Sequence, residues 1–333
     1  MNNILIQFFI PLIIFSLLYF FKDPIAKSLK LYDTPNKTIK FHKKKTPKLG
    51  GLILVLNGAI ILYFSIVFKE NIFSKILLLT IMCSLVGLLD DIIDISPYKK
   101  FIILTSIIIT FLLFNHEFRI EKIIFKNFIF EKIIIIESKE IISIFLTTLC
   151  YLLIVNAYNM SDGHNGLASF IALSWFLYFL SYKSPIYFFL TPIIVCIFLI
   201  FIFNVKSKIF LGDSGNYFIS VIFASLVINQ NNITNNFFAE EIFILFMLPG
   251  IDMLRLFILR IINKKNPFKG DRQHIHHYLK NKIKNDYLVL ILYLILFISP
   301  IIFMVGKLMD NILIIIIFIS IYLISLTKLI KNK

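Results

Sequence analysis

The chain alternates between long apolar blocks and short polar breaks. The blocks run for roughly 18 to 22 residues, the length that a helix needs to cross a bilayer. This pattern predicts eleven transmembrane helices and therefore an all-α polytopic membrane protein that forms a single integral membrane domain over residues 1–333. The expected helices cover residues 4–21, 51–68, 76–94, 100–114, 141–158, 166–181, 185–204, 214–229, 241–261, 287–306 and 311–328.

Two stretches stand out from the other blocks and breaks. Residues 118–137 alternate apolar and charged side chains around Lys126 and Asn127, which predicts a small β-hairpin on the outer face of the membrane. The N-terminal block lacks a basic leading region and a small-residue cleavage site. We therefore expect a retained first membrane helix and not a signal peptide.

The distribution of Lys and Arg predicts the orientation of the chain. Of 34 such residues, 24 fall in alternate breaks on one side, nine fall on the other side, and Arg255 lies within an apolar block. The richest breaks are residues 22–50, with nine Lys, and residues 260–286, with eight Lys or Arg. The richer side is expected to face the cytoplasm. That places the N-terminus outside and the C-terminus inside.

Composition narrows the class of protein. Hydrophobic residues make up 59% of the chain and charged residues 16%, and the mean hydropathy is +0.88. A soluble domain carries about 25% charged residues, so a soluble enzyme and a disordered chain are both excluded. The three cysteines lie in apolar blocks without metal-binding spacing and are expected to be buried hydrophobic residues. A net charge of +15 in so apolar a chain indicates an anionic partner.

Acidic residues gather at the predicted cytoplasmic end of the third apolar block. Asp90, Asp91 and Asp94 share a DDxxD pattern, and helical spacing would put Asp90 and Asp94 one turn apart. Carboxylates this close repel unless a cation or a proton holds them, and hard oxygen ligands suit Mg²⁺ or Mn²⁺. A solvated acidic helix end is the plain alternative. A polyprenyl synthase site would need a second such motif, which is absent.

Two further polar motifs fall on the same predicted side. Asn156, Asn159 and Asp162 recur every three residues before a Gly-rich turn, so they can orient phosphate or metal ligands along one side of a helix; a capped helix end is the alternative. Asp213 lies in FLGDSG, shortly after Asn204, and can bind a metal. The alternative for Asp213 is an ordinary N-cap.

The two basic breaks complete the set. The segment PFKGDRQHIHH at residues 267–277 combines Arg, Asp and three His, a set that suits a diphosphate and its sugar. A zinc site is a weaker reading, because neither Cys nor HExxH accompanies it. The segment around His42 and Lys48 suits either a specific phosphate site or anionic lipid headgroups. Nucleotide-binding glycine motifs are absent, and no nucleic-acid partner is expected.

Taken together, these motifs resemble the polyprenyl-phosphate N-acetylhexosamine-1-phosphate transferases, the glycosyltransferase 4 family. The resemblance extends from about residue 31 to residue 280, and the motifs stand in the family's order. DRQHIHH is most similar to the branch that makes undecaprenyl-diphospho-GlcNAc, and less similar to the branch that uses UDP-MurNAc-pentapeptide. The motifs are LYDTPN at 31–36, His42 with Pro47 and Gly50-Gly51, LLDDIIDIS at 88–96, NAYNMSDGHNGLA at 156–168, FLGDSG at 210–215, Asp252 after Pro249, and PFKGDRQHIHHYL at 267–279.

The resemblance implies a transferase of the inner (plasma) membrane with its active site facing the cytoplasm. A polyprenyl phosphate, undecaprenyl phosphate in this branch, would attack the β-phosphorus of a UDP-N-acetylhexosamine, with GlcNAc as the expected sugar, and UMP would leave. The product would start the synthesis of a cell-surface polysaccharide such as lipopolysaccharide or O-antigen. Mg²⁺, or Mn²⁺ in its place, is the expected cofactor, and the resemblance also allows a homodimer.

The resemblance also implies roles for individual residues. Asp213 and Asp91 are the expected metal ligands, and Asp90, Asp91 and Asp162 the expected catalytic residues. Three positions depart from the family pattern. Asn165 stands where the family usually has a second Asp, the segment VKSKIF after Asn204 lacks the proline common there, and Asn216 stands where Ser is frequent. The expected substrate-binding residues are His42, Lys48, Asn156, Asn159, Asn204, Asp271, Arg272, His274, His276 and His277.

A non-enzyme reading stays open on the residues alone. A transporter or flippase for an anionic lipid or a sugar phosphate would also combine apolar helices with basic loops. Such proteins often contain inverted repeats with polar residues at the midplane of the membrane. Here no repeat is visible, and the carboxylates gather at one predicted face. A membrane structural or assembly protein would need none of these motifs.

Overall fold

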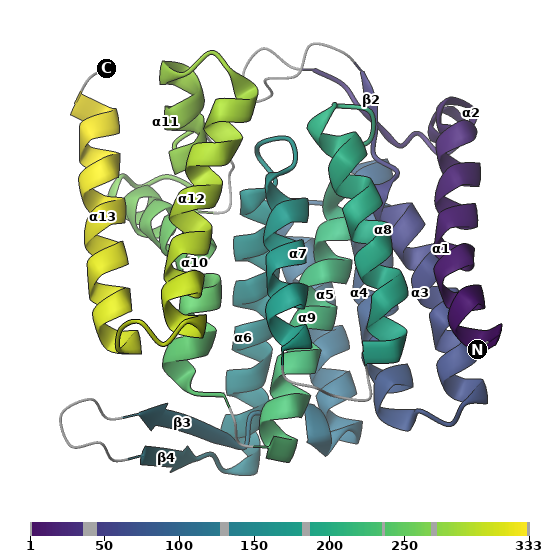
Figure 1. The fold of residues 1–333 in the computed structure, drawn as a ribbon, viewed down its shortest axis with the longest axis horizontal. Coiled ribbons are helices and arrows are strands. Elements are labelled where there is room, and N and C mark those ends of the chain that lie inside the picture. Colours follow the sequence, from purple (N-terminus) through teal and green to yellow (C-terminus); the bar gives the residue numbers. More distant parts are fainter. Residues whose placement is uncertain are drawn as a thin grey trace. The chain divides into compact units, whose positions relative to one another are not determined.

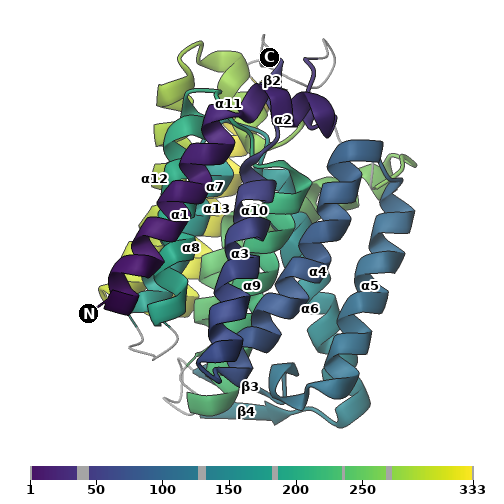
Figure 2. The same cartoon turned by 90° about the vertical axis from the view of Figure 1, so that its right-hand side faces the viewer.

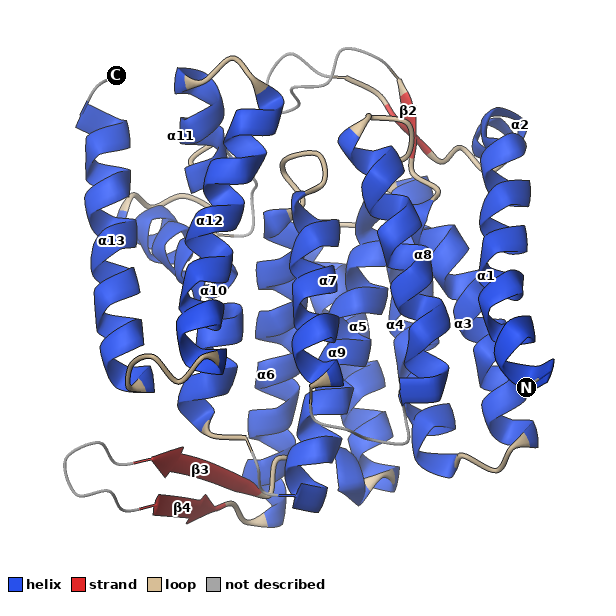
Figure 3. Ribbon diagram, viewed as in Figure 1, coloured by secondary structure: helices blue, strands red, loops and turns tan. Residues whose placement is uncertain are grey.

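The computed structural model describes residues 2–35, 45–126, 133–181, 187–234, 237–267 and 272–331, and it is mostly helical (Figures 1 and 3). The helices are α1 (Asn2–Phe20), α2 (Lys22–Ser28), α3 (Gly50–Val67), α4 (Asn71–Ile93), α5 (Pro97–Phe114), the 3₁₀ turn η1 (His116–Phe118), α6 (Glu140–Ser161), α7 (Leu167–Leu180), α8 (Tyr187–Val205), α9 (Gly212–Thr234), α10 (Ala239–Ile262), α11 (Ile275–Lys282), α12 (Asp286–Val305) and α13 (Asn311–Lys331). The strands are β1 (Tyr32–Asp33), β2 (Thr46–Pro47), β3 (Lys122–Lys126) and β4 (Ile133–Glu137).

Each of the eleven apolar blocks corresponds to a helix in the structure. Among the described residues, seven helices are long and apolar enough to cross a membrane. An eighth is counted if residues Phe9–Phe20 and α2, which meet at a bend of 72°, form one span. The protein is therefore an all-α, multi-pass membrane protein. The full set of eleven spans and its orientation stay predictions.

The β-hairpin expected at residues 118–137 is confirmed. Strands β3 and β4 pair antiparallel, with Lys122 opposite Glu137 and Lys126 opposite Ile133, and the predicted turn residue Asn127 lies outside the described residues. The expectation that Asp94 continues the helix of Asp90 is wrong. Helix α4 ends at Ile93, and Asp94 caps it in the left-handed conformation (φ 55°), so its side chain leaves the helical register.

The chain forms two compact units. Unit 1 comprises Met1–Phe114 and Ala168–Leu226. In it, α3 packs against α1, α4 and α8, and α4 packs against α5; Figure 2 shows α3 and α4 side by side. Aromatic rings hold α1 to α8, with the ring centroids of Tyr19 and Phe203 4.3 Å apart. Because dispersion contacts between packed side chains sum over many atoms, these ring pairs fix the helices laterally.

Among the residues whose burial the structure describes, helix α9 is the most buried of the long helices. Every residue from Ser214 to Asn231 is buried, although the helix carries several Ser and Asn side chains. The hydroxyl groups of Ser220 and Ser225 donate to carbonyl oxygens of their own helix, those of Asn216 and Val221. A helix that does not face lipid can carry such groups when its own backbone satisfies them. These two hydroxyl groups are therefore satisfied inside a helix that is buried despite its low hydropathy.

Unit 2 comprises Asn115–Leu167 and Val227–Lys333. In it, α10 packs against α6, α12, α13 and strand β3. The backbone N–H of Lys126 donates to Glu240 Oε1 over 2.7 Å, which fastens the hairpin to the first turn of α10. In Figure 3 the two strands lie across the direction of α6 and α10. The hairpin therefore lies at the N-terminal end of α10.

Candidate active site

Backbone hydrogen bonds within unit 1 join the FLGDSG motif to the start of α3. The N–H of Phe210 donates to the carbonyl oxygen of Pro47 over 2.8 Å. The N–H groups of Gly50 and Gly51 donate to the carbonyl oxygens of Phe210 and Leu211 over 2.9 and 2.8 Å. These bonds place the first turn of α9 beside the segment that carries Lys48.

Glycines allow the same turn to approach the acidic end of α4. Gly212 has φ +74°, a left-handed conformation that favours glycine, and a Cβ there would lie 2.5 Å from Asp91 Oδ2. A Cβ on Gly87 would lie 2.6 Å from the backbone nitrogen of Ser214. Gly87 and Gly212 thus allow Asp213 and Ser214 to lie against Asp91.

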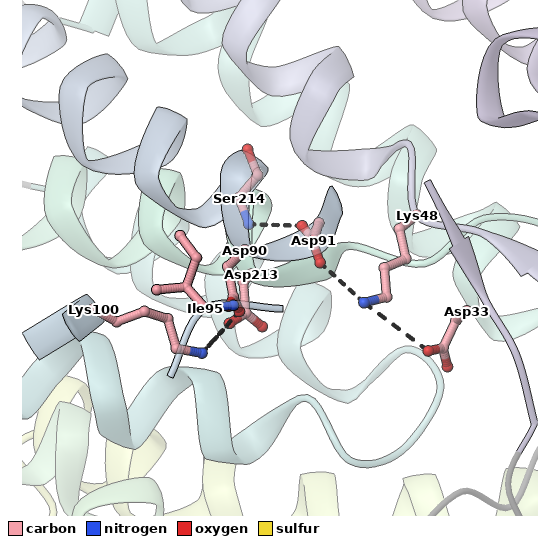
Figure 4. A network of polar contacts seen from close by, with 8 residues as sticks. All are labelled: Asp33, Lys48, Asp90, Asp91, Ile95, Lys100, Asp213 and Ser214. Carbon is pink, nitrogen blue, oxygen red and sulfur yellow. Dashed lines mark hydrogen bonds and ion pairs between the residues drawn. The ribbon is translucent and has the colours of Figure 1, made fainter. Parts of the chain in front are cut away.

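Asp91 is held from two sides (Figure 4). Its Oδ1 lies 3.1 Å from Lys48 Nζ, and its Oδ2 accepts a hydrogen bond from the backbone N–H of Ser214 over 3.1 Å. Lys48 Nζ also lies 4.0 Å from Asp33 Oδ1. The Asp91 side chain is 2% exposed, so both of its oxygens are engaged inside the protein.

A second lysine joins the other two aspartates of this site. Lys100 Nζ lies 2.8 Å from Asp90 Oδ2 and 3.2 Å from Asp213 Oδ2, and Figure 4 shows the two carboxylates converging on it. The backbone N–H of Ile95 donates to Asp90 Oδ1 over 2.7 Å. The Asp213 side chain is 23% exposed, which leaves it open to a ligand from solvent.

We call Asp33, Lys48, Asp90, Asp91, Lys100 and Asp213 the carboxylate–lysine network. Counted in their ionised forms, four carboxylates face two ammonium groups in it, a formal excess of two negative charges. Burial is the largest single effect and disfavours the charged form of Lys48, but the carboxylates of Asp91, Asp33 and Asp213 together outweigh it, so the pKa of Lys48 lies above its ordinary value. The network therefore has the charge to attract a divalent cation.

The oxygen donors of this network fit Mg²⁺. Among the described residues, no group of three or more His, Cys, Asp or Glu side chains forms a ready metal cage. Mg²⁺ does not need one, because it keeps several waters and is commonly held by one or two carboxylates together with substrate phosphates. Asp90 and Asp213, which already share one cation in Lys100, offer such a pair.

The remaining predicted residues of unit 1 lie apart from this network or outside the described chain. Asn204 is buried, and its Nδ2 donates to the carbonyl oxygen of Ile209 over 3.0 Å, so its amide closes the loop before FLGDSG. Asp94 is exposed. His42 lies outside the described residues. Lys100 was not among the predicted residues, because only the fold brings it to Asp213.

Unit 2 gathers the histidines of the last motif at the start of α11. His274, His276 and His277 are all buried, at 7%, 2% and 6% exposure. The rings of His274 and His276 stack with centroids 5.4 Å apart, and His276 and His277 meet edge to face at 4.2 Å. His274 Nδ1 lies 2.8 Å from Asp252 Oδ2 of helix α10. We call Asp252, Arg255, His274, His276, His277 and Tyr322 the histidine cluster.

The Asn-rich motif meets this cluster through Gly163, which follows Asp162 at the end of α6. A Cβ on Gly163 would collide with Nε2 of His276, so a glycine is needed for this close approach. Burial, together with the neighbouring His277 and His274, holds the pKa of His276 well below its ordinary value. His276 Nε2 has no hydrogen-bond partner among the described residues, so the ring lies neutral against the glycine turn.

The other predicted residues of unit 2 take different positions. Asn156 Nδ2 donates to the carbonyl oxygen of Leu152 in its own helix over 2.7 Å. Asn159 and Asp162 lie at the end of α6, where the N–H of Asp162 donates to the carbonyl oxygen of Asn159. Arg272 precedes the histidines, and Asp271 lies outside the described residues. Asp252 entered the sequence analysis as part of a motif without a role, since its partners are 22 and 70 residues away.

Comparison with known proteins agrees with these motifs. The model of the family Glycosyl transferase family 4 matches residues 73–231. A phospho-N-acetylmuramoyl-pentapeptide-transferase from Dictyoglomus turgidum is 32% identical over 240 residues, covering 68% of this chain and 73% of that protein. An undecaprenyl-phosphate alpha-N-acetylglucosaminyl 1-phosphate transferase from Thermotoga maritima is 27% identical over 272 residues, 78% of this chain and 76% of that protein.

The undecaprenyl-phosphate alpha-N-acetylglucosaminyl 1-phosphate transferase from Escherichia coli K12 is 28% identical over 286 residues, which cover 80% of this chain and 74% of that protein. The alignments thus extend well beyond the span of the family model and include relatives from both branches of the family. The chain therefore belongs to glycosyl transferase family 4 and is a membrane-embedded glycosyl-1-phosphate transferase.

Proposed function

We propose that this enzyme transfers N-acetylglucosamine 1-phosphate from its UDP-sugar to undecaprenyl phosphate. An oxygen of the lipid phosphate attacks the β-phosphorus, a new diphosphate bond forms to the lipid, and the bond to UMP breaks. The carboxylate–lysine network carries this proposal, since its excess negative charge suits a cation that must screen two approaching anions. The names of relatives in the GlcNAc branch support the choice of sugar and lipid.

Asp213 and Asp90 are the residues that would hold Mg²⁺, or Mn²⁺ in its place. A bound divalent cation would neutralise the charge that develops on the transferring phosphates. Asp91, which the sequence also marks as a metal ligand, has both oxygens engaged by Lys48 and Ser214. We therefore favour Asp90 over Asp91 beside Asp213, and we assign Asp91 the role of holding Lys48 toward a phosphate.

The histidine cluster is the proposed contact for the sugar diphosphate. His274, His276 and His277 lie with Asp252 and Arg255 in unit 2, and imidazole and guanidinium groups donate hydrogen bonds to phosphate oxygens. Asn159 and Asp162 are assigned to the same substrate. Roles for His42, Asn156, Asn204, Asp271 and Arg272 in substrate binding stay predictions from the sequence.

The membrane setting is part of the proposal. We place the active site at the cytoplasmic face of the inner (plasma) membrane, with eleven spans, an outer N-terminus and a cytoplasmic C-terminus. The asymmetry of Lys and Arg in the polar breaks supports this orientation. We further propose that both compact units act as one transferase domain. A homodimer stays a prediction.

A UMP-release assay tests the function. Membranes that contain the protein are given undecaprenyl phosphate, Mg²⁺ and, in turn, UDP-GlcNAc, UDP-GalNAc or UDP-MurNAc-pentapeptide. We expect UMP release and a lipid-diphospho-sugar with UDP-GlcNAc, and loss of both with EDTA. Release with UDP-MurNAc-pentapeptide alone would move the enzyme to the other branch. No UMP with any of the sugars would contradict the proposal and favour transport of an anionic lipid.

A further inference from the structure

One carboxylate in unit 2 accepts hydrogen bonds from four groups. Asp252 Oδ1 lies 2.8 Å from Arg255 Nη2 and accepts from the hydroxyl of Tyr322 over 2.7 Å. Asp252 Oδ2 lies 2.8 Å from His274 Nδ1 and 3.4 Å from the backbone nitrogen of Ile275. The donors come from α10, α13 and the start of α11, so they converge from three separate stretches of the chain.

The chemistry of these groups fixes the hydrogen on His274. Arg255 and Tyr322 both donate to Asp252, so its buried carboxylate is ionised and can only accept. His274 Nδ1 must therefore carry a hydrogen to make its 2.8 Å contact. In the neutral imidazole this leaves Nε2 as the nitrogen with the lone pair, and in the imidazolium it leaves Nε2 as the free donor.

The other contacts of the array hold Asp252 itself. Arg255 Nε donates to the hydroxyl oxygen of Tyr322 over 2.9 Å, and Arg255 Nη2 donates to the carbonyl oxygen of Gln273 over 2.6 Å. The same arginine thus fixes the carboxylate and the residue that precedes His274. A buried carboxylate costs free energy unless it is paired and fully hydrogen-bonded, and this array satisfies that requirement.

We propose that Asp252 is a positioning residue of the transferase that keeps His274 as its Nδ1–H tautomer, so that the lone pair of Nε2 accepts a hydrogen bond from a hydroxyl group of the sugar nucleotide. The inference rests on the proposed function, because it needs His274 to contact substrate. Asp252 acts only through His274. Arg255 and Tyr322 act one step further out, by holding Asp252.

The surroundings of His274 agree with this assignment. Asp252 is the carboxylate that pairs with it, Arg255 offsets the charge of that carboxylate, and the rings of His276 and His277 lie 5.4 and 5.9 Å away. Burial holds the pKa of His276 well below its ordinary value, so this neighbour stays neutral near pH 7. No second cation therefore comes from His276 to compete for Asp252.

A double-mutant cycle tests the proposal in the full-length protein in membranes. The variants are Asp252→Asn, His274→Gln and the double variant, and the assay is UMP release with undecaprenyl phosphate and UDP-GlcNAc. An amide can donate to Nδ1 and so permits the other tautomer. Loss of a partner that orients a metal-ligating histidine typically costs about 10- to 100-fold, and the same scale is expected where the histidine contacts a substrate. We expect a loss of that size in kcat for Asp252→Asn, with the KM for the lipid phosphate unchanged.

Two comparisons separate positioning from plain structural support. If Asp252 acts through His274, the double variant is no slower than His274→Gln alone, and Asp252→Glu restores part of the activity. Losses that multiply in the double variant would overturn the proposal. Glu137→Gln, an exposed carboxyl-to-amide change at the end of β4, serves as the matched control and is expected to keep full activity.

The outcomes also distinguish this inference from the proposed function. If His274→Gln keeps full activity, the proposed contact of His274 with substrate fails. If His274→Gln is slow while Asp252→Asn is not, only the positioning role of Asp252 fails. ¹⁵N NMR of histidine-labelled protein checks the tautomer without any turnover, with the His274 signals identified by their loss in His274→Gln. A hydrogen on Nε2 and none on Nδ1 in the wild type would overturn the proposal.

Discussion

The carboxylate–lysine network and the histidine cluster differ in how far their carboxylates are balanced by positive groups. The carboxylate–lysine network of unit 1 leaves two negative charges without a counter-charge and keeps Asp213 partly exposed. In the histidine cluster of unit 2 a single carboxylate is met by Arg255, His274, Tyr322 and a backbone N–H, all buried or nearly so. The first is an unbalanced site suited to a cation that arrives with substrate. The second is balanced and rigid.

This difference explains why the two sites should respond differently to substitution. Removing a charge from the unbalanced network changes what it can bind, and at Asp213 the fold loses little because that side chain is partly solvated. Removing a partner from the balanced cluster leaves buried groups unpaired and costs stability as well. Activity and stability measured on the same variants therefore test the contrast directly.

The largest effect is expected at Asp213. Asp213→Asn removes one of the two carboxylates that converge on Lys100 and lowers the charge available to a divalent cation. We expect kcat for UMP release to fall about 10³-fold, the loss typical when a charge-stabilising group is removed, while the thermal unfolding midpoint in detergent changes little. Asp23→Asn, at an exposed carboxylate paired with Lys22, is the control and should keep full activity. Full Mg²⁺-dependent transfer by Asp213→Asn would refute the role of the network.

The next effect probes the packing of unit 2. Gly163→Ala would place a methyl group against Nε2 of the buried His276 ring, and overpacking a buried site typically costs about 1–3 kcal/mol. We expect a lower thermal unfolding midpoint and reduced transfer. Gly250→Ala is the matched control, since a Cβ at Gly250 meets nothing within 4 Å and alanine is the better helix former. An unchanged unfolding midpoint in Gly163→Ala would show that the turn is free to move.

The sequence predicted the eleven long helices well because each one lies in a long run of apolar side chains. It did not predict the short polar helices α2 and α11. It predicted the ends less well. Asp94 ends helix α4 in a left-handed conformation, and the apolar periodicity of the sequence does not predict this end. The sites were predicted in part, as motifs that carry Asp90, Asp91 and Asp213. Lys100 was missed because its partner Asp213 lies 113 residues away.

Asp252 shows the same limit in the other unit. Its partners His274 and Tyr322 lie 22 and 70 residues along the chain. An aspartate in an apolar block marks a site of interest, but only packing shows which donors surround it. The glycines of the motifs indicated the positions of the sites better than the aspartate did. Gly163 and Gly212 stand in recognisable motifs, and both prove to lie where a side chain would collide with a functional group.

A smaller effect tests the charge balance of unit 1. Lys100→Met removes the ammonium group between Asp90 and Asp213, so the carboxylates gain net negative charge and lose a competitor for a metal. We expect Mn²⁺ to bind about tenfold more tightly, which corresponds to about 1.4 kcal/mol, as measured by electron paramagnetic resonance of free Mn²⁺. Lys99→Met, one residue away and exposed, should leave the affinity unchanged. Weaker Mn²⁺ binding in Lys100→Met would mean that the lysine helps to hold the metal.

The smallest effect concerns the pH dependence of folding stability. The histidine of unit 2 should lower stability at low pH, and the Lys48 ion pair of unit 1 should be lost only at high pH. The pKa of His276 lies well below its ordinary value in the folded protein, so only the unfolded chain takes up its proton as the pH falls below about 6.5. Stability is present above that pH and is lost below it, by at most about 1.4 kcal/mol per pH unit. Burial lowers the pKa of His164 too, against the opposing charge of Asp286, and adds loss of the same sign.

Lys48 of unit 1 has the reverse sign. Its pKa is raised in the folded protein, so its contribution is present below the unfolded value of about 10.4 and is lost as the pH rises through the folded value. Unfolding midpoints in detergent between pH 5 and 7.5 should therefore report unit 2 and leave the Lys48 ion pair intact. We expect His276→Gln to flatten this acid slope and His116→Gln, at an exposed histidine, to keep it. If both variants keep the wild-type slope, His276 is already protonated in the fold, and the histidine cluster is not the neutral, balanced site that its geometry indicates.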